Sequence, residues 1–189
     1  SEDYYIVAAG SYLGISLSKG ASFPVGKVDM IELQPMTYKE FLMSSGQDML
    51  VEYIESIGKI EPISAPVLNK LNDYLREYYI VGGMPEAVKI WTGSRDFNQL
   101  ENTQENIINA YFRDFSKHPP ASMVPKIAAI WGSIVSQLSR ENRKFKYSEI
   151  NKSARAREYE NALEWLIAGS YLCKVTIVDR CQLPLKGYE

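Results

Sequence analysis

The sequence is constrained most by a helical spacing of apolar residues that ends at a pair of glycines. Between residues 67 and 79 the apolar side chains recur at helical offsets, at Val67, Leu68, Leu71, Tyr74, Leu75, Tyr78 and Tyr79. This spacing predicts an amphipathic helix. Gly82 and Gly83 end it, and Pro85 suits the first turn of a next helix over residues 86–91. The pattern favours a mainly α-helical chain.

Further helices are predicted on both sides of this one. Thr37 and Glu40 have the spacing of a capping box, which predicts a short helix from Tyr38 to about Ser44. Helical patterns also cover residues 12–17, 98–115, 124–138, 147–151 and 154–168. The sequence His118-Pro119-Pro120 interrupts them, because two prolines cannot lie inside a helix. It is the best candidate for a domain boundary.

Three segments have the composition of β-strands. Tyr4–Ala9 is apolar on both faces, as in a strand buried in the middle of a parallel sheet. Val28–Leu33 alternates in part, and Tyr171–Val178 follows the last helix. Because a parallel strand needs neighbours and few are present, we expect the chain to begin inside a domain. Three helices followed by a strand, over residues 122–189, is the order of a winged helix-turn-helix.

Composition and charge exclude several classes of protein. The 189 residues are 46% hydrophobic and 23% charged, which excludes an intrinsically disordered chain. No run of 18 apolar residues occurs, so we expect no membrane span and a cytoplasmic location. Cys173 and Cys181 cannot form a disulfide scaffold, which fits a reducing compartment. The single histidine, His118, disfavours a His-based metal site or a His-dependent triad, and no metal site is expected.

The basic residues gather in one stretch of the chain. The formal net charge is −2, which argues against coating nucleic acid through bulk charge. Residues 140–158 nevertheless hold seven basic and three acidic side chains, a local charge of +4. The basic ones are Arg140, Arg143, Lys144, Lys146, Lys152, Arg155 and Arg157. A local basic patch on an acidic body is a more specific signal than the overall charge.

Seven short blocks, each weak by itself, occur in a fixed order along the chain. They are Ala8–Ser11, Phe23–Val28, Leu33–Leu42, Tyr79–Glu86, Tyr111–Lys117, Gln137–Tyr147 and Ala154–Glu160. In this order they resemble a large family of prokaryotic AAA-type ATPases over nearly the whole chain. The resemblance implies a mainly α chain with a small α/β remnant. Residues 1–45 would be the end of a P-loop ATPase core, residues 46–118 its helical lid and residues 122–189 a winged helix.

The same resemblance implies that the chain is a fragment. In the family, the Walker A and Walker B motifs precede the strand that begins here, and a further C-terminal domain follows. ATP and Mg²⁺ would bind the full-length protein, and neither is expected to bind this chain tightly, because phosphoryl transfer needs a phosphate cradle and a Mg²⁺ ligand. The rest of the parent chain is then a partner, and an oligomer stays open.

The resemblance also gives roles to individual residues. Ser11 corresponds to the sensor position at a strand end, where a polar side chain reaches the γ-phosphate or the attacking water, and is the candidate catalytic residue. The alternative is a serine that caps the following helix. Gly82, Gly83 and Pro85 would start a lid helix that packs over the nucleotide base. Their alternative role is an ordinary turn between two helices.

A winged helix adds a second function, binding to double-stranded DNA or to a protein target. The third helix of such a domain enters the major groove. The candidate DNA contacts, three to phosphates and the last two to base edges, are Lys144, Lys146, Lys152, Arg155 and Arg157. Glu158, Glu160 and Glu164 on the same helix would repel DNA. The alternative to the ATPase interpretation is therefore a DNA-binding or protein-interaction module with no catalytic role of its own.

We predict that this chain alone neither hydrolyses ATP nor binds it with micromolar affinity. The physical reason is that no Gly-Lys-Ser/Thr loop is present to cradle the phosphates. Isothermal titration with ATP and Mg²⁺, together with a phosphate-release assay on the pure chain, checks the prediction. Sustained turnover or a micromolar dissociation constant would contradict it.

Overall fold

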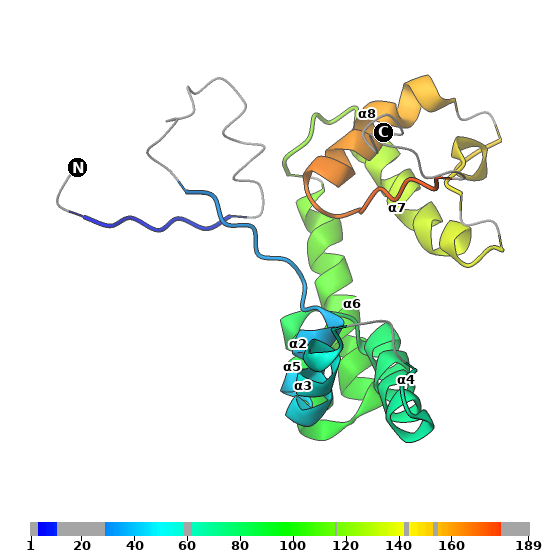
Figure 1. Cartoon of the computed structure of the whole chain (residues 1–189). Coiled ribbons are helices and arrows are strands. Elements are labelled where there is room, and N and C mark those ends of the chain that lie inside the picture. Colours follow the sequence, from blue (N-terminus) through cyan, green and yellow to red (C-terminus); the bar gives the residue numbers. More distant parts are fainter. Residues whose placement is uncertain are drawn as a thin grey trace. The chain divides into compact units, whose positions relative to one another are not determined.

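The computed structural model describes residues 4–10, 29–58, 62–115, 117–141, 144–152 and 155–178 (Figure 1). The prediction of a mainly α-helical chain is confirmed. The elements are α2 (Tyr38–Ser44), α3 (Asp48–Ser56), α4 (Ala65–Val81), α5 (Pro85–Ser94), α6 (Phe97–Asp114), α7 (Val124–Leu138), the 3₁₀ helix η1 (Tyr147–Glu149) and α8 (Ala156–Ala168). Of the helices in these ranges, none combines the length and the apolar character needed to cross a membrane.

The chain divides into two compact units. The first unit, Met30–Arg113, contains α2 to α5 and all of α6 except its last residue. The second, Ser1–Asp29 with Asp114–Glu189, contains α7, η1 and α8. The division falls between Arg113 and Asp114, ahead of the expected boundary at His118-Pro119-Pro120. The expected boundary at residue 45 lies within the first unit, between α2 and α3, which contact each other.

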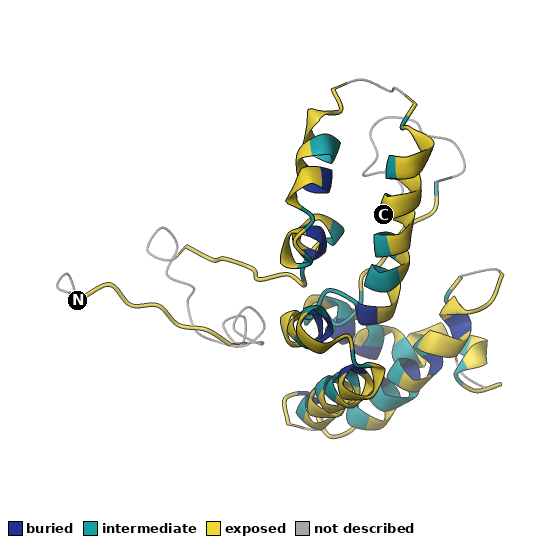
Figure 2. Ribbon diagram, turned by 90° about the horizontal axis from the view of Figure 1, so that it is seen from below, coloured by how far each residue is buried: buried dark blue, intermediate teal, exposed yellow. Residues whose placement is uncertain are grey.

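The first unit is built around the short helix α2, which contacts α3, α4 and α5. Its two adjacent apolar residues, Phe41 and Leu42, are both fully buried and face different clusters. Phe41 packs with residues of α4, α5 and α6, namely Val81, Ala87, Val88, Trp91 and Leu100. Leu42 packs with Leu50 and Val51 of α3. Figure 2 shows the buried positions gathered where these helices meet.

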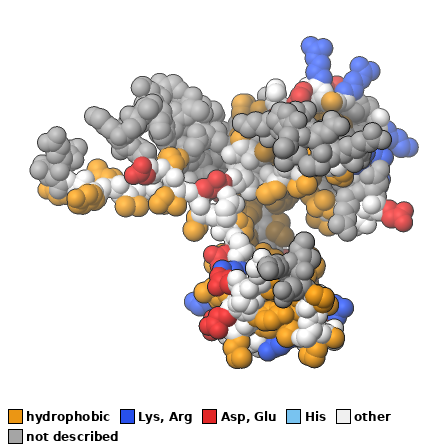
Figure 3. Space-filling model, in the orientation of Figure 1, with side chains coloured by type: hydrophobic (Ala, Val, Ile, Leu, Met, Phe, Trp, Pro, Cys, Tyr) orange, Lys and Arg blue, Asp and Glu red, His pale blue; other side chains and the backbone are white. Residues whose placement is uncertain are grey.

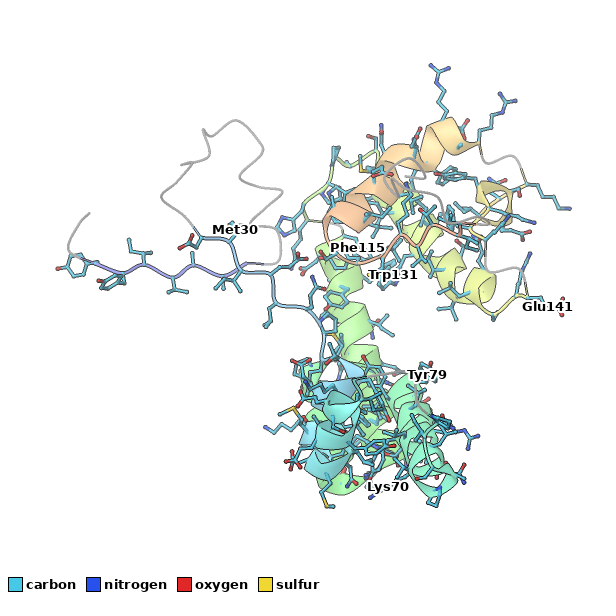
Figure 4. All side chains as sticks on the ribbon, in the orientation of Figure 1. Met30, Lys70, Tyr79, Phe115, Trp131 and Glu141 are labelled. Carbon is cyan, nitrogen blue, oxygen red and sulfur yellow. The ribbon has the colours of Figure 1, made fainter. Side chains whose placement is uncertain are left out.

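The core around α7 and α8 centres on Phe115, which follows α6 and is 1% exposed. Its ring makes edge-on contacts with three aromatic rings, at 5.0 Å to Trp131, 6.0 Å to Trp165 and 5.0 Å to Tyr171. Figure 4 shows Phe115 beside Trp131. The buried aliphatic side chains of α7 and α8 are Ile127, Ile130, Ala162 and Leu166. Such tilted aromatic pairs add directional stabilisation to apolar burial.

The predicted helix ends agree closely with the structure. The helix predicted over 124–138 coincides with α7, and those over 67–79 and 98–115 correspond to α4 and α6. The capping box at the start of α2 is confirmed. The Glu40 N–H donates to Thr37 Oγ1 at 3.3 Å, and the Thr37 N–H donates to Glu40 Oε2 at 2.7 Å. These bonds satisfy amides that a helix start leaves without partners.

The predictions of strands are wrong for the residues that the structure describes. Tyr4–Ala9 forms no strand and is exposed throughout, with Tyr5 and Val7 open to solvent. Residues 29–33 and 171–178 form no strand either, and Val28 and the helix predicted over 12–17 lie outside the described residues. A strand persists only where a neighbour pairs with its N–H and C=O groups. Apolar composition does not supply that neighbour.

Candidate functional site

The turn between α4 and α5 depends on Gly82. Helix α4 ends at Val81 and α5 begins at Pro85. Gly82 has φ 74° and ψ −173°, a conformation that is open to glycine and strained for other residues. Its N–H donates to the Tyr78 carbonyl at 2.8 Å. Pro85 fits the first position of α5, because its ring fixes a helical φ where no intrahelical N–H bond is needed.

Gly83 lies directly against the backbone of Met36, far earlier in the sequence. The Met36 N–H donates to the Gly83 carbonyl at 2.7 Å. A Cβ atom at residue 83 would lie 2.3 Å from the Met36 carbonyl oxygen, closer than non-bonded atoms approach. Glycine is therefore required at this position by packing. We call this contact, with Met36, Tyr78, Gly82 and Gly83, the Met36–Gly83 junction.

Two tyrosines fasten the start of α2 to α4. The Tyr78 hydroxyl donates to the Met36 carbonyl at 2.7 Å, and the Tyr38 hydroxyl donates to the Leu71 carbonyl at 2.6 Å. Burial, with a smaller contribution from Tyr74, raises the pKa of Tyr38 above its ordinary value. The Tyr38 hydroxyl thus stays protonated and remains a donor near neutral pH. Both polar groups of the Met36 backbone are held, its N–H by Gly83 and its carbonyl by Tyr78.

Helix α6 closes over the same turn. The Gln104 side-chain amide donates to the Ile80 carbonyl at 2.8 Å and to the Val81 carbonyl at 3.1 Å. These carbonyls belong to the last turn of α4, where a helix leaves its acceptors without intrahelical donors. The Tyr111 hydroxyl lies 3.9 Å from Met84 Sδ. The end of α4, the turn and α6 are therefore linked by side-chain bonds.

A charged cluster fixes the other end of α5 to α4. The Glu77 carboxylate accepts from the Trp91 indole N–H at 3.0 Å and pairs with the Arg95 guanidinium. The Arg95 Cζ lies 5.1 Å from the centre of the Trp91 ring, a cation–π geometry. Arg95 is also the C-cap residue of α5, in a left-handed conformation with φ 54°. Its ion pair with Glu77 therefore links the C-terminal end of α5 to α4.

The structure brings together three of the four residues expected at a nucleotide site. Gly82, Gly83 and Pro85 belong to one turn, whereas Ser11 lies outside the described residues. Pro85 is exposed at the start of α5, and the acidic Glu86 follows it. Across the described ranges, no group of three or more His, Cys, Asp and Glu side chains is placed to hold a metal ion.

The residues expected to contact DNA lie in and beside the connection between α7 and α8. Their side chains are exposed at Lys144, Lys146, Lys152, Arg155 and Arg157. None of the five makes an ion pair with another described residue. Arg140, by contrast, pairs with Glu149 at 2.7 Å. Figure 3 shows blue side chains projecting from the unit that contains α7 and α8.

Sequence reasoning missed Met36, Tyr78 and Gln104 as parts of the junction. The helical spacing of α4 predicts Tyr78 as a core residue and says nothing of its hydroxyl. No local pattern reports a contact between residues 36 and 83. One signal was available, because Gly82 alone is enough to end α4. A second glycine beside it indicates a close approach of another backbone.

The chain is helical and has two compact units. In one unit the Gly82-Gly83 turn packs against Met36, and in the other exposed basic side chains lie between α7 and α8. The chain belongs to the family described as a domain of unknown function, DUF8612, whose model matches residues 72–183. This span includes Gly83 and the basic connection, and it leaves out Met36. Comparison with curated proteins and with solved structures gave no match.

Replacing Gly83 by alanine tests the junction. The added Cβ would meet the Met36 carbonyl oxygen at 2.3 Å, so the backbones must separate. We expect a loss of about 1–3 kcal/mol in the free energy of unfolding. Gly93→Ala in α5 is the matched control, because nothing lies within 4 Å of its Cβ position, and it should be neutral or stabilising by up to about 1 kcal/mol. Urea unfolding followed by far-UV circular dichroism measures both, and equal effects would contradict the account.

The capping box predicts a pH dependence. Hydrogen bonds from the Thr37 backbone and side chain lower the pKa of Glu40 below its ordinary value of 4.5. A carboxyl whose pKa is lowered by folding stabilises the protein fully above that ordinary value. The contribution is lost as the pH falls through the lower folded pKa. The melting temperatures of the protein and of Glu40→Gln should therefore converge in acid.

Thr37→Ala supplies the control for this pH dependence. It removes the hydroxyl bond to the Glu40 carboxylate and leaves the backbone N–H bond at 2.7 Å in place. The pH-dependent difference in melting temperature that Glu40→Gln causes should therefore be smaller in a Thr37→Ala background, without disappearing. A gap between the protein and Glu40→Gln that stays constant into acid would show that the carboxylate does not act through Thr37.

Proposed function

We propose that the part of the first unit from α3 to α6 is the helical lid of an AAA-type ATPase, that the segment containing Met36 belongs to the end of the nucleotide-binding core, and that the Met36–Gly83 junction links the two. One observation carries this proposal. Two of the blocks that resemble the ATPase family, Leu33–Leu42 and Tyr79–Glu86, are far apart in sequence. The 2.7 Å bond between the Met36 N–H and the Gly83 carbonyl joins them in space.

The junction has the properties that a mechanical link requires. Met36 is held through both its N–H and its carbonyl, and no side chain separates it from Gly83. Close-packed contacts of this kind transmit a displacement instead of absorbing it. Movement of the segment before α2 would thus shift the turn between α4 and α5, and Gln104 would carry the shift to α6. In this proposal the lid drives the unit that contains α7 and α8, the proposed winged helix.

The start of α5 suits contact with a nucleotide base better than contact with phosphate. The first turn of a helix offers N–H groups without intrahelical acceptors, and Pro85 leaves this end open. Glu86 in that turn opposes an anion. We therefore propose that the start of α5 in the lid contacts the nucleotide base and that Ser11 is the sensor residue. Bound ATP with Mg²⁺ would supply the phosphoryl group, and the parent protein would supply the phosphate cradle.

The experiment uses the whole product of the gene that encodes this chain. We expect a Gly-Lys-Ser/Thr loop upstream of Ser1 and ATP hydrolysis by the purified product. Gly83→Ala should lower the turnover number at least about tenfold, since a contact that positions a catalytic site is worth more than about 1.4 kcal/mol. Gly93→Ala, the matched control, should leave it unchanged. A product that binds no ATP, or a Gly83→Ala variant with full turnover, would contradict the proposal.

A further inference from the structure

We infer that the connection between α7 and α8 binds the phosphate backbone of duplex DNA without reading its base sequence. This inference goes beyond the lid function and rests on different residues. The described residues of the connection are 139–141, which follow α7, residues 144–152, which contain η1, and Arg155, which precedes α8. The five exposed side chains without ion-pair partners among the described residues are Lys144, Lys146, Lys152, Arg155 and Arg157.

The connection is anchored to α7 by a buried side chain. Gln137 is 3% exposed, and its Oε1 atom accepts the Lys146 N–H at 2.7 Å. Its Nε2 atom donates to Ser133 Oγ at 3.2 Å. The pair Arg140–Glu149, at 2.7 Å, ties the end of α7 to η1. The chain that carries Lys144 and Lys146 is therefore positioned before a ligand arrives, which lowers the entropy cost of binding.

The surface around Lys144 and Lys146 keeps a net positive charge after the Arg140–Glu149 ion pair is left out of the count. Arg140 and Glu149 neutralise each other. Among the described residues from 140 to 158, the five basic side chains then face two exposed carboxylates, Glu141 and Glu158. Lysine and arginine that lack a protein partner bind DNA phosphates, and the counterions released from the DNA favour the complex. Because the rest of the sequence is acidic, DNA is directed to this surface.

The exposed face of α8 argues against reading of bases. Arg157, Glu160 and Glu164 share one helical face, since residues three and four apart are neighbours, and all three are exposed. The opposite face buries Ala162 and Leu166. A helix that enters the major groove with two carboxylates beside one arginine is repelled by the flanking phosphates. The structure thus favours phosphate contacts for Arg155 and Arg157, in place of the base contacts expected from the sequence.

The same two carboxylates lie near the phenol of Tyr147 in η1. Burial raises the pKa of Tyr147, and the charges of Glu160 and then Glu164 raise it further. This acidic side of α8 therefore adjoins η1 and borders the basic connection. DNA that approaches Lys144 and Lys146 meets these carboxylates at the edge of the surface, which holds α8 out of the groove.

The binding experiment uses this chain without nucleotide and follows the fluorescence anisotropy of two labelled duplexes of equal length and unrelated sequence. We expect both to bind with affinities within about threefold of each other, because phosphate contacts carry no sequence information. The affinity should fall steeply with added salt. The triple variant Lys144→Gln, Lys146→Gln, Lys152→Gln should weaken binding at least tenfold and reduce the log–log salt slope by about 2.7, at about 0.9 per lost contact.

Two further variants make the test decisive. Lys70→Gln with Lys89→Gln removes two exposed lysines of α4 and α5 and should leave the affinity unchanged. Glu160→Gln with Glu164→Gln removes the repulsion and should tighten binding. The inference is overturned by binding that does not respond to salt, by an equal loss in the Lys70 and Lys89 control, by no binding at low salt, or by about hundredfold preference for one sequence. The salt slope and sequence comparison of the unmodified chain decide it even if a variant fails to fold.

Discussion

The hydrogen bond between the Met36 N–H and the Gly83 carbonyl determines where α2 can begin. Helix α2 has seven residues, too few to be stable in water by itself. Its position depends on the Thr37 cap and on the Met36 backbone, which Gly83 and Tyr78 hold from two sides. From that position α2 directs Phe41 into one apolar cluster and Leu42 into another. Both clusters of the first unit therefore depend on one backbone contact.

This contact joins a residue inside the span that the family model matches to a residue outside it. The matched span begins at residue 72, inside α4, so Gly83 belongs to it and Met36 does not. The glycine turn packs against Met36, which precedes the matched span. Because this contact is between backbone atoms, no flexible side chain lies between the Met36 segment and the Gly83 turn, and the distance between them is fixed. Lys144, Lys146 and Lys152, between α7 and α8, lie in the same span and are exposed.

The sequence predicted the parts of this fold that local physics determines. Helical spacing located α4, α6 and α7, and the pair Thr37 and Glu40 located the start of α2. The prediction of a strand at Tyr4–Ala9 was wrong, because a strand needs a neighbouring strand to pair with and the composition of these residues says nothing about a neighbour. The second glycine at residue 83 indicated a close approach of another backbone, but no local pattern identified Met36 as the partner. The sequence already placed Glu160 and Glu164 on the same helix as Arg157, and the structure adds that all three side chains are exposed while Ala162 and Leu166 are buried.

The most direct test of the central claim is the hydrogen exchange rate of the Met36 amide, measured by NMR in the folded chain. We expect this amide to exchange much more slowly than that of exposed Ile31 in the same segment, because the Gly83 carbonyl accepts its hydrogen. Gly83→Ala should remove the protection at Met36, and Gly93→Ala should leave it intact. A Met36 amide that exchanges as fast as Ile31, or one whose protection survives Gly83→Ala, would contradict the account.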